Sequence, residues 1–344
     1  MTGIFFATIA GINSGLTNQI FSLVISVLFA IQRKNHTVVI GQFQPDIFDT
    51  SIKLIDCDEI FNLEETNKNL KENNIPVNLM CKSKLNYKLK SILYGSGDNI
   101  IDITEQSPSV ILTGSYNSIK GDPSPGVVKQ LCVNYLMNNK EFIDLYDETY
   151  NFNIHVKNVN NESSRGFVNK ETKHLFDLIL NCLQYKTCID SVSFLPLLNS
   201  DEKNNVIHLR LEDDSIQHWS RQNNLNPSIF KTQLEEKYIH MILHHIDKNV
   251  KTIIVGSKQN KVIDFLQENN YNYIFYNLNL NGREINAIYD LIQASQCNET
   301  FISNFNYKEF NGSSFSYYIS AISKSKKIVA IDIDRINSPY ILYN

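Results

Sequence analysis

Short apolar runs alternate with segments of helical length along most of this chain, and this alternation limits the fold more than any other feature. Residues 4–10 form an apolar run that ends in a glycine-containing turn, and residues 16–32 are apolar nearly all round. A second apolar run follows at 37–40. Strand, turn, buried helix and strand in this order predict a βαβ unit, whose two strands lie parallel in one sheet.

The same alternation returns in the second half of the chain. The predicted strands are 206–211, 252–255, 273–276, 300–303 and 327–331, and the predicted helices are 228–248, 259–269, 284–296 and 313–324. A polar cluster at 198–204 separates the two halves, so we predict one domain at 1–198 and another at 199–344. The predicted fold class is therefore α/β, with two doubly wound, Rossmann-like domains that face each other across a cleft.

The remainder of the first half is less regular. Residues 109–113 are apolar and β-branched, which predicts a strand, and residues 126–147 and 172–186 are predicted helices. The segment 151–171 is rich in Asn and Ser and lacks periodicity, so we expect a surface loop there.

Charge and apolar content exclude several classes of protein. The net charge of −4, from 32 basic and 36 acidic residues, weighs against nucleic acid as a partner. The apolar run 20–31 is shorter than the roughly 20 residues that cross a bilayer, and no basic residue precedes Arg33, so neither a membrane span nor a signal peptide is expected. The six cysteines form no Cys-x-x-Cys pair, which favours free thiols and a cytoplasmic protein.

Open α/β sheets bind ligands at the carboxyl ends of their strands, so the residues that follow each strand are the informative ones. The first such segment is the loop 11–19, which contains Gly15 and Asn18. A loop of this kind offers backbone N–H groups and a helix N-terminus to an anion. It lacks the dinucleotide Gly-x-Gly-x-x-Gly pattern and the P-loop lysine. The alternative is a tight turn in which Asn18 caps the helix.

The second segment is His208-Leu-Arg-Leu-Glu-Asp-Asp214. Strand alternation places His208 and Arg210 on the same side, with Arg210 at or near the carboxyl end of the strand. The planar guanidinium of Arg matches the oxygens of a diphosphate and keeps its charge. The alternative is that Arg210 simply forms an ion pair with Glu212 or Asp214.

The third segment is Gly312-Ser-Ser-Phe-Ser316, at the predicted start of a helix that follows a strand. Glycine allows close approach of the backbone, and serine hydroxyls and helix N–H groups can hold a phosphate. The alternative is an ordinary serine N-cap.

Three groups of residues raise the question of a metal ion. Asp56-Cys-Asp58 and Asp332-Ile-Asp334 have the Asp-x-Asp form found with divalent ions, and His240 and His244 are spaced to share a helix face. Two acids separated by one residue are frequent by chance, and no third ligand accompanies the histidines. We therefore predict no metal site.

The order of these segments resembles that of the fucosyltransferase superfamily, which includes the α1,2-, α1,6- and protein O-fucosyltransferases. Members open with a strand and a Gly-Gly-x-Gly-Asn-Gln-like turn into an apolar helix, and residues 13–21 here have the form Asn-Ser-Gly-Leu-Thr-Asn-Gln-Ile-Phe. A strand with His-x-Arg follows in mid-chain, as His208-Leu-Arg210 does here. Near the end, Ser-Ser/Thr-Phe-Ser enters a helix, as at residues 313–316.

This resemblance implies a GT-B-like fold, a GDP-fucose donor, transfer to a glycan or protein hydroxyl with inversion at the sugar, and neither metal nor other cofactor. It implies that Arg210 contacts the leaving diphosphate and that Asn18 lies near the β-phosphate and the acceptor. Glu212 and Asp214 are candidates, by position alone, for a base or an acceptor contact. The implied donor-binding residues are Gly15, His208, Gly312, Ser313, Ser314 and Phe315.

The chain also departs from the superfamily pattern. Thr17 stands where glycine is usual, no second arginine follows Arg210, and residues 305–311 look inserted before the Ser-Ser-Phe segment. Gly256-Ser257 stands where an acid is frequent, whereas Asp290 does match an acid often found in the helix before the late strand. The alternatives are therefore a transferase of the same fold that uses a xylosyl, rhamnosyl or other donor, and a non-catalytic relative that binds a glycan or a nucleotide.

Overall fold

The computed structural model divides into two compact units, Met1–Lys186 and Thr187–Asn344. This division falls earlier in the chain than the predicted boundary after residue 198. The structure describes residues 3–343 except 8, 10–14, 33–34, 47, 50, 85–86, 105–120, 138, 148–171, 187, 190–191, 194–201, 276–281 and 307–310. The predicted strand 109–113 and the predicted loop 151–171 therefore lie outside the described residues.

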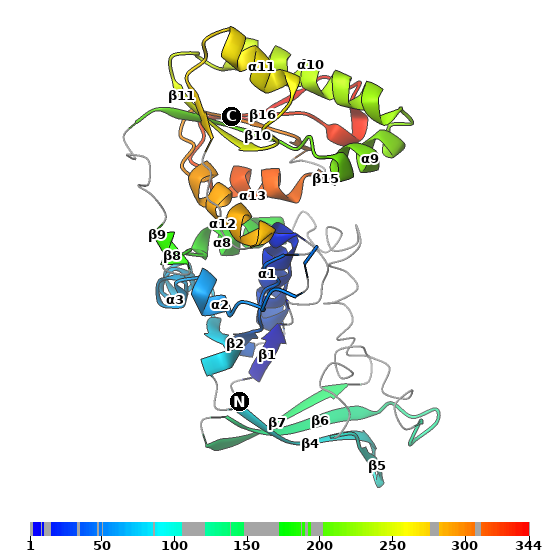
Figure 1. The fold of residues 1–344 in the computed structure, drawn as a ribbon. Coiled ribbons are helices and arrows are strands. Elements are labelled where there is room, and N and C mark those ends of the chain that lie inside the picture. Colours follow the sequence, from blue (N-terminus) through cyan, green and yellow to red (C-terminus); the bar gives the residue numbers. More distant parts are fainter. Residues whose placement is uncertain are drawn as a thin grey trace. The chain divides into compact units, whose positions relative to one another are not determined.

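The first unit contains the predicted βαβ arrangement (Figure 1). Strands β1 (Gly3–Ala7), β2 (Asn35–Ile40) and β3 (Asn78–Cys81) form a parallel sheet in the order β1-β2-β3. Helix α1 (Leu16–Gln32) connects the first two strands, and nearly all of its side chains are buried, which explains why its sequence is apolar all round. It packs against the sheet and against α8 (Lys173–Cys182), where the rings of Phe21 and Phe176 lie 5.1 Å apart.

The predicted helix at 126–147 is wrong, because this segment forms two strands. Strands β6 (Gln130–Met137) and β7 (Lys140–Asp147) join β4 (Tyr87–Ser96) and β5 (Asn99–Asp102) in an antiparallel sheet of order β5-β4-β6-β7. Leu131, Val133 and Tyr135 are buried at every second position, which is the period of a strand with one covered face. The short helices α2 (Cys57–Ile60) and α3 (Leu63–Glu72) precede this sheet in the chain.

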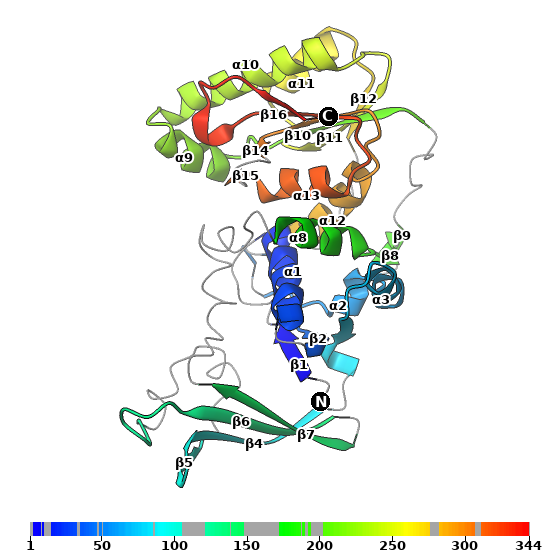
Figure 2. The same cartoon turned by 180° about the vertical axis from the view of Figure 1, so that it is seen from behind.

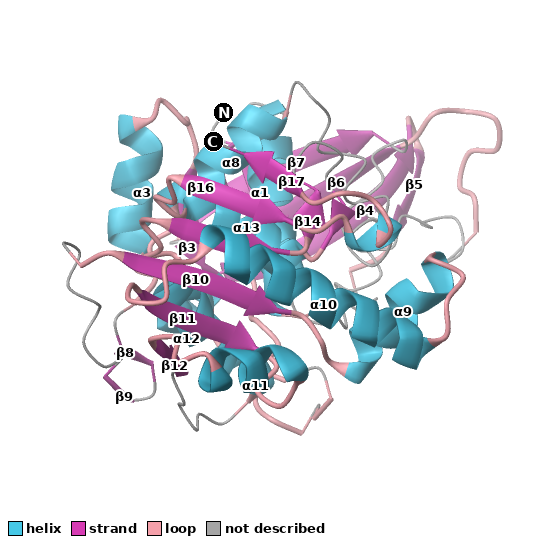
Figure 3. Ribbon diagram, turned by 90° about the horizontal axis from the view of Figure 1, so that it is seen from above, coloured by secondary structure: helices cyan, strands magenta, loops and turns pink. Residues whose placement is uncertain are grey.

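The second unit is built on a six-stranded sheet of order β12-β11-β10-β13-β16-β17. Its strands are β10 (Asn204–Leu209), β11 (Lys251–Gly256), β12 (Tyr273–Phe275), β13 (Thr300–Ser303), β16 (Lys327–Ala330) and β17 (Ile341–Tyr343). All neighbours pair in parallel except β16 and β17, and Figure 3 shows the arrowheads of β10, β11 and β16 at the same end. The five predicted strands of this half are confirmed, and β17 completes the edge.

Helices cover both faces of this sheet. Figures 1 and 2 show α10 (Pro227–His245) and α11 (Lys261–Glu268) on one face, and α12 (Arg283–Ala294) and α13 (Ser314–Ile322) on the other. These four helices correspond to the four predicted ones. Helix α9 (Asp213–Gln222), which begins within the run of acids after β10, was not predicted.

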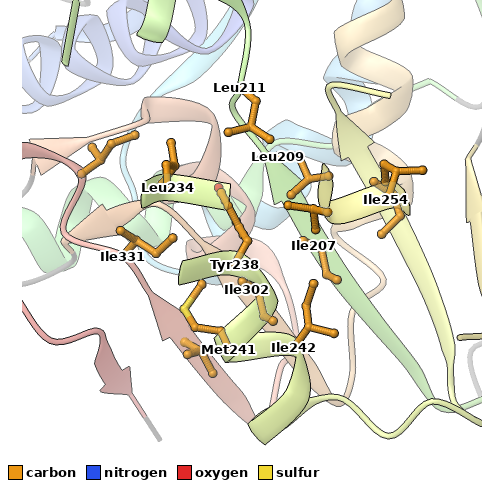
Figure 4. Close-up of a cluster of buried hydrophobic side chains, with 14 of the residues drawn as sticks. Ile207, Leu209, Leu211, Leu234, Tyr238, Met241, Ile242, Ile254, Ile302 and Ile331 are labelled. Carbon is orange, nitrogen blue, oxygen red and sulfur yellow. The ribbon is translucent and has the colours of Figure 1, made fainter. Parts of the chain in front are cut away.

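The core of the second unit lies between α10 and the sheet (Figure 4). Tyr238, Met241 and Ile242 of α10 are fully buried against Ile207 and Leu209 of β10 in one apolar cluster. Leu243 of the same helix is 57% exposed, because it lies outside the buried face that Tyr238, Met241 and Ile242 form. Within the described part of the chain, no helix is long and apolar enough to cross a membrane.

Candidate functional site

As predicted, Arg210 lies immediately after the carboxyl end of the central strand β10. Its guanidinium forms two ion pairs, from Nη1 to Glu212 Oε2 and from Nη2 to Asp214 Oδ2, each 2.9 Å long. Glu212 is the N-cap residue of α9, and Asp213 and Asp214 occupy the first turn, where acids are favourable at the positive end of the helix dipole. The ion pairing offered as the alternative role of Arg210 is therefore present in this structure.

His208 lies two residues earlier on β10 and is 4% exposed. Its Nδ1 is 2.6 Å from Ser316 Oγ, and the Ser316 hydroxyl donates to Asn304 Oδ1 at 2.8 Å. Since the single hydroxyl proton of Ser316 points to Asn304, His208 Nδ1 donates its own proton and Nε2 is left as an acceptor. Burial, with a smaller contribution from Arg210, lowers the pKa of His208 to about 3, so this imidazole is neutral at physiological pH.

The segment 312–316 begins α13, as predicted, and the fold brings it to His208. Ser313 is the N-cap residue, and its hydroxyl accepts from the backbone N–H of Ser316 at 3.4 Å, as in the N-cap alternative. The ring of Phe315 lies 4.9 Å from that of His208. Residues of the apparent insertion form the hairpin strands β14 (Phe305–Asn306) and β15 (Asn311–Gly312), which lead directly into this helix.

Gly312 fits the close approach that its sequence position suggested. Its φ is +95°, and a Cβ atom there would lie 2.5 Å from the carbonyl oxygen of Asn304. Only glycine fits such a contact without displacement of the backbone. The tight hairpin is thus what turns the chain from β13 into α13 beside His208.

Two more polar residues lie near the same strand ends. Asn304 was not predicted as a site residue, and Asp290 was noted without a role. Asn304 directly follows β13 and is fully buried, and among the described residues no acceptor bonds its Nδ2. Burial raises the pKa of Asp290 on α12 to about 7; the charge of Glu212 adds to this, and that of Lys258 acts in the opposite direction. The rule that points to residues after strands would have found Asn304, whereas the environment of Asp290 depends on packing.

Asp290 predicts a pH dependence of stability. Its pKa in the folded chain, about 7, lies above the ordinary value of 3.8, so folding favours the protonated acid. Its contribution is fully present below about pH 4 and is lost as pH rises to 7. We expect urea unfolding, followed by Trp219 fluorescence, to show wild type losing on the order of 3 kcal/mol relative to Asp290→Asn between pH 4.5 and 8. Equal pH profiles for the two proteins would contradict this, and Asp264→Asn, an exposed acid of α11, serves as the control.

The first-unit candidates, Gly15 and Asn18, lie at the start of α1. The Gly15 carbonyl accepts from the backbone N–H groups of Asn18 and Gln19 at 3.0 and 3.2 Å. Helix α1 already begins at Leu16, so Asn18 is inside its first turn and the alternative that Asn18 caps the helix is wrong. Residues 11–14 of this loop lie outside the described part of the chain.

A scan of the sequence against models of known protein families finds no match, and a search of curated proteins finds no similar sequence.

Proposed function

We propose that this chain is an inverting glycosyltransferase that moves fucose from GDP-fucose to a glycan or protein hydroxyl without a metal ion. The proposal includes a GT-B-like pair of Rossmann-like domains and a cytoplasmic location, with which the free thiols of the described cysteines agree. The observation that carries it is the convergence, at one edge of the second-unit sheet, of Arg210, a buried neutral His208 and the first residues of α13. These belong to two of the three segments on which the superfamily resemblance depends.

In the proposed reaction, the main task of the residues at this edge of the sheet is to stabilise negative charge. Cleavage of the bond between the sugar C1 and the β-phosphate oxygen leaves growing negative charge on the diphosphate, and the leaving group needs no proton. Arg210 supplies a fixed positive charge with two parallel donors, and its acidic partners give way to phosphate oxygens. The first N–H groups of α13 add a positive helix end. Glu212 and Asp214 are, by position, the candidates to accept the proton of the acceptor hydroxyl.

A donor screen tests the proposal. Thermal-shift measurements with GDP-fucose, GDP-mannose, and UDP- and dTDP-sugars should show the largest stabilisation with GDP-fucose, since a ligand that binds only the folded chain raises its melting temperature. Slow release of GDP from GDP-fucose should accompany it. Greater stabilisation by a xylosyl or rhamnosyl donor would mean that the transferred sugar is not fucose. Binding of a donor without transfer to any acceptor tested would indicate a non-catalytic relative.

Asp214→Asn should strengthen nucleotide binding. Asp214 is 53% exposed and neutralises one arm of Arg210, so the neutral amide removes a negative charge beside Nη2 and weakens the competition for Arg210. We expect the Kd for GDP, measured by calorimetry at low salt, to fall by about 3- to 10-fold, with a smaller change at high salt. Glu268→Gln, an exposed acid at the end of α11, is the control and should leave the Kd unchanged. A weaker Kd in Asp214→Asn would mean that Asp214 orients Arg210 instead of competing for it.

A further inference from the structure

A second cluster of chemically active side chains lies in the first unit, around the Asp-Cys-Asp segment. Asp56 and Asp58 flank the start of α2, and Cys81 is the last residue of β3. One donor atom from each of these three residues lies within 4.8 Å of the other two. Cys81 is 3% exposed, so the sulfur is held inside the fold and the carboxylates reach it from the surface.

One pair of these atoms has a separation that suits two ligands of a tetrahedral metal ion. The Cys81 thiol donates a hydrogen bond to Asp58 Oδ1, and Sγ and Oδ1 are 3.4 Å apart. Zinc bonds of about 2.3 Å to sulfur and about 2.0–2.2 Å to oxygen, at a tetrahedral angle, place the two ligand atoms about 3.5 Å apart. The observed pair therefore already has the separation of two ligands of one zinc ion.

A second buried sulfur belongs to the same cluster. Cys57, between the two acids, is fully buried, and its thiol interacts with that of Cys81. Two buried thiols from segments far apart in the sequence thus meet beside two carboxylates. Sulfur ligands select soft or borderline ions such as Zn²⁺ over Mg²⁺ or Ca²⁺, which require oxygen.

The surroundings orient the carboxylate as outer-shell groups do in metal sites. Lys84 forms an ion pair with Asp58 Oδ2 at 2.5 Å, while Oδ1 of the same carboxylate faces Cys81. The Ser83 hydroxyl lies 3.0 Å from Cys81 Sγ. Such partners fix ligand orientation without taking up the coordinating atoms.

We propose that Asp56, Asp58 and Cys81 bind one zinc ion, with the buried Cys57 beside them. Binding replaces the thiol proton of Cys81, which is released to solvent, and three protein ligands leave a fourth position for water. The ion links the start of α2 to the end of β3, two segments joined only by a long connection through α3. This site lies in the first unit and is separate from the metal-independent transfer assigned to the second.

Cobalt titration of the full-length chain tests the site. The protein, reduced and freed of metal by a chelator, should bind one Co²⁺ per chain, with a sulfur-to-cobalt charge-transfer band in the near ultraviolet and the visible bands of tetrahedral Co²⁺. Zn²⁺ should displace the cobalt and abolish both. Cys81→Ser should lose the charge-transfer band, Asp58→Asn should lose stoichiometric binding, and Cys57→Ser should weaken zinc binding by about 10- to 100-fold. Cys132→Ser, on β6, is the matched control and should bind normally.

Circular dichroism identifies a variant that fails to fold, and Asp58→Asn, which retains both thiols, then decides the result. Absence of a charge-transfer band in the wild-type chain overturns the proposal, as does a band that survives Cys81→Ser. A Cys57–Cys81 disulfide found by mass spectrometry in the freshly purified, metal-free chain also overturns it, because the sulfurs would then serve as a redox pair.

Discussion

Replacement of Arg210 by alanine is expected to lower the turnover number of fucose transfer by about two to three orders of magnitude, the usual cost of one lost donor to developing charge. Arg210 follows the central strand directly, and its side chain is 21% exposed, so its charge is held at the strand end with little freedom. Alanine leaves the leaving diphosphate without a cation at this position. Initial rates of GDP release with saturating GDP-fucose measure the effect.

The comparison variants separate charge from shape. Arg210→Lys keeps the charge but loses the forked pair of donors, so we expect an intermediate loss of turnover. Arg221→Ala removes an exposed arginine from the last turn of α9 and should retain wild-type turnover. Activity of Arg210→Ala close to that of wild type would show that Arg210 is only the ion-pair partner of Glu212 and Asp214, and the proposed mechanism would be wrong.

The sequence predicts the second unit well because its signals are local. The five predicted strands of that sheet are short apolar runs, and some helices have a local start signal, such as Asn226 before α10 and Asn260 before α11. The helix predicted at 126–147 is wrong because the segment forms two strands, and the buried positions of the first, Leu131, Val133 and Tyr135, recur at period two. Helix α9 was not predicted because Ile216 and Trp219 are its only large apolar side chains; Asp213 and Asp214 lie in its first turn, where acids are favourable.

The sequence predicts which segments form the candidate site, but it does not predict the hydrogen bonds between them. Position after a strand was enough to select Arg210 and the segment 312–316. The hydrogen bond between His208 and Ser316 joins residues 108 positions apart, and the tautomer of His208 follows from the further bond to Asn304. Such a network depends on how α13 packs across the sheet, which no local pattern records. The family resemblance rests on the order of the segments along the chain, whereas the contacts between them are seen only in the structure.

Gly256→Ala is expected to have the largest effect on the stability of the second unit. Gly256 ends β11 with φ +95°, and a Cβ atom there would lie 2.4 Å from the carbonyl oxygen of Leu209, a backbone atom of the neighbouring strand. The same oxygen accepts a hydrogen bond from Ser257 N–H at 2.9 Å, so it cannot move away without losing that bond. We expect the free energy of unfolding to fall by about 2–4 kcal/mol, because the strained φ angle and the overlap with the backbone act together.

Trp219, the single tryptophan, is buried in the second unit and reports urea unfolding of that unit by fluorescence. Ser257→Ala is the matched control: it removes only the contact of Ser257 Oγ with Leu211 N–H, at 3.3 Å, and should cost about 1 kcal/mol. Since Leu209 precedes Arg210, displacement of its carbonyl in Gly256→Ala should also lower turnover at temperatures where the variant is still folded. Wild-type stability in Gly256→Ala would mean that β10 and β11 are not paired in the register that brings Gly256 against Leu209.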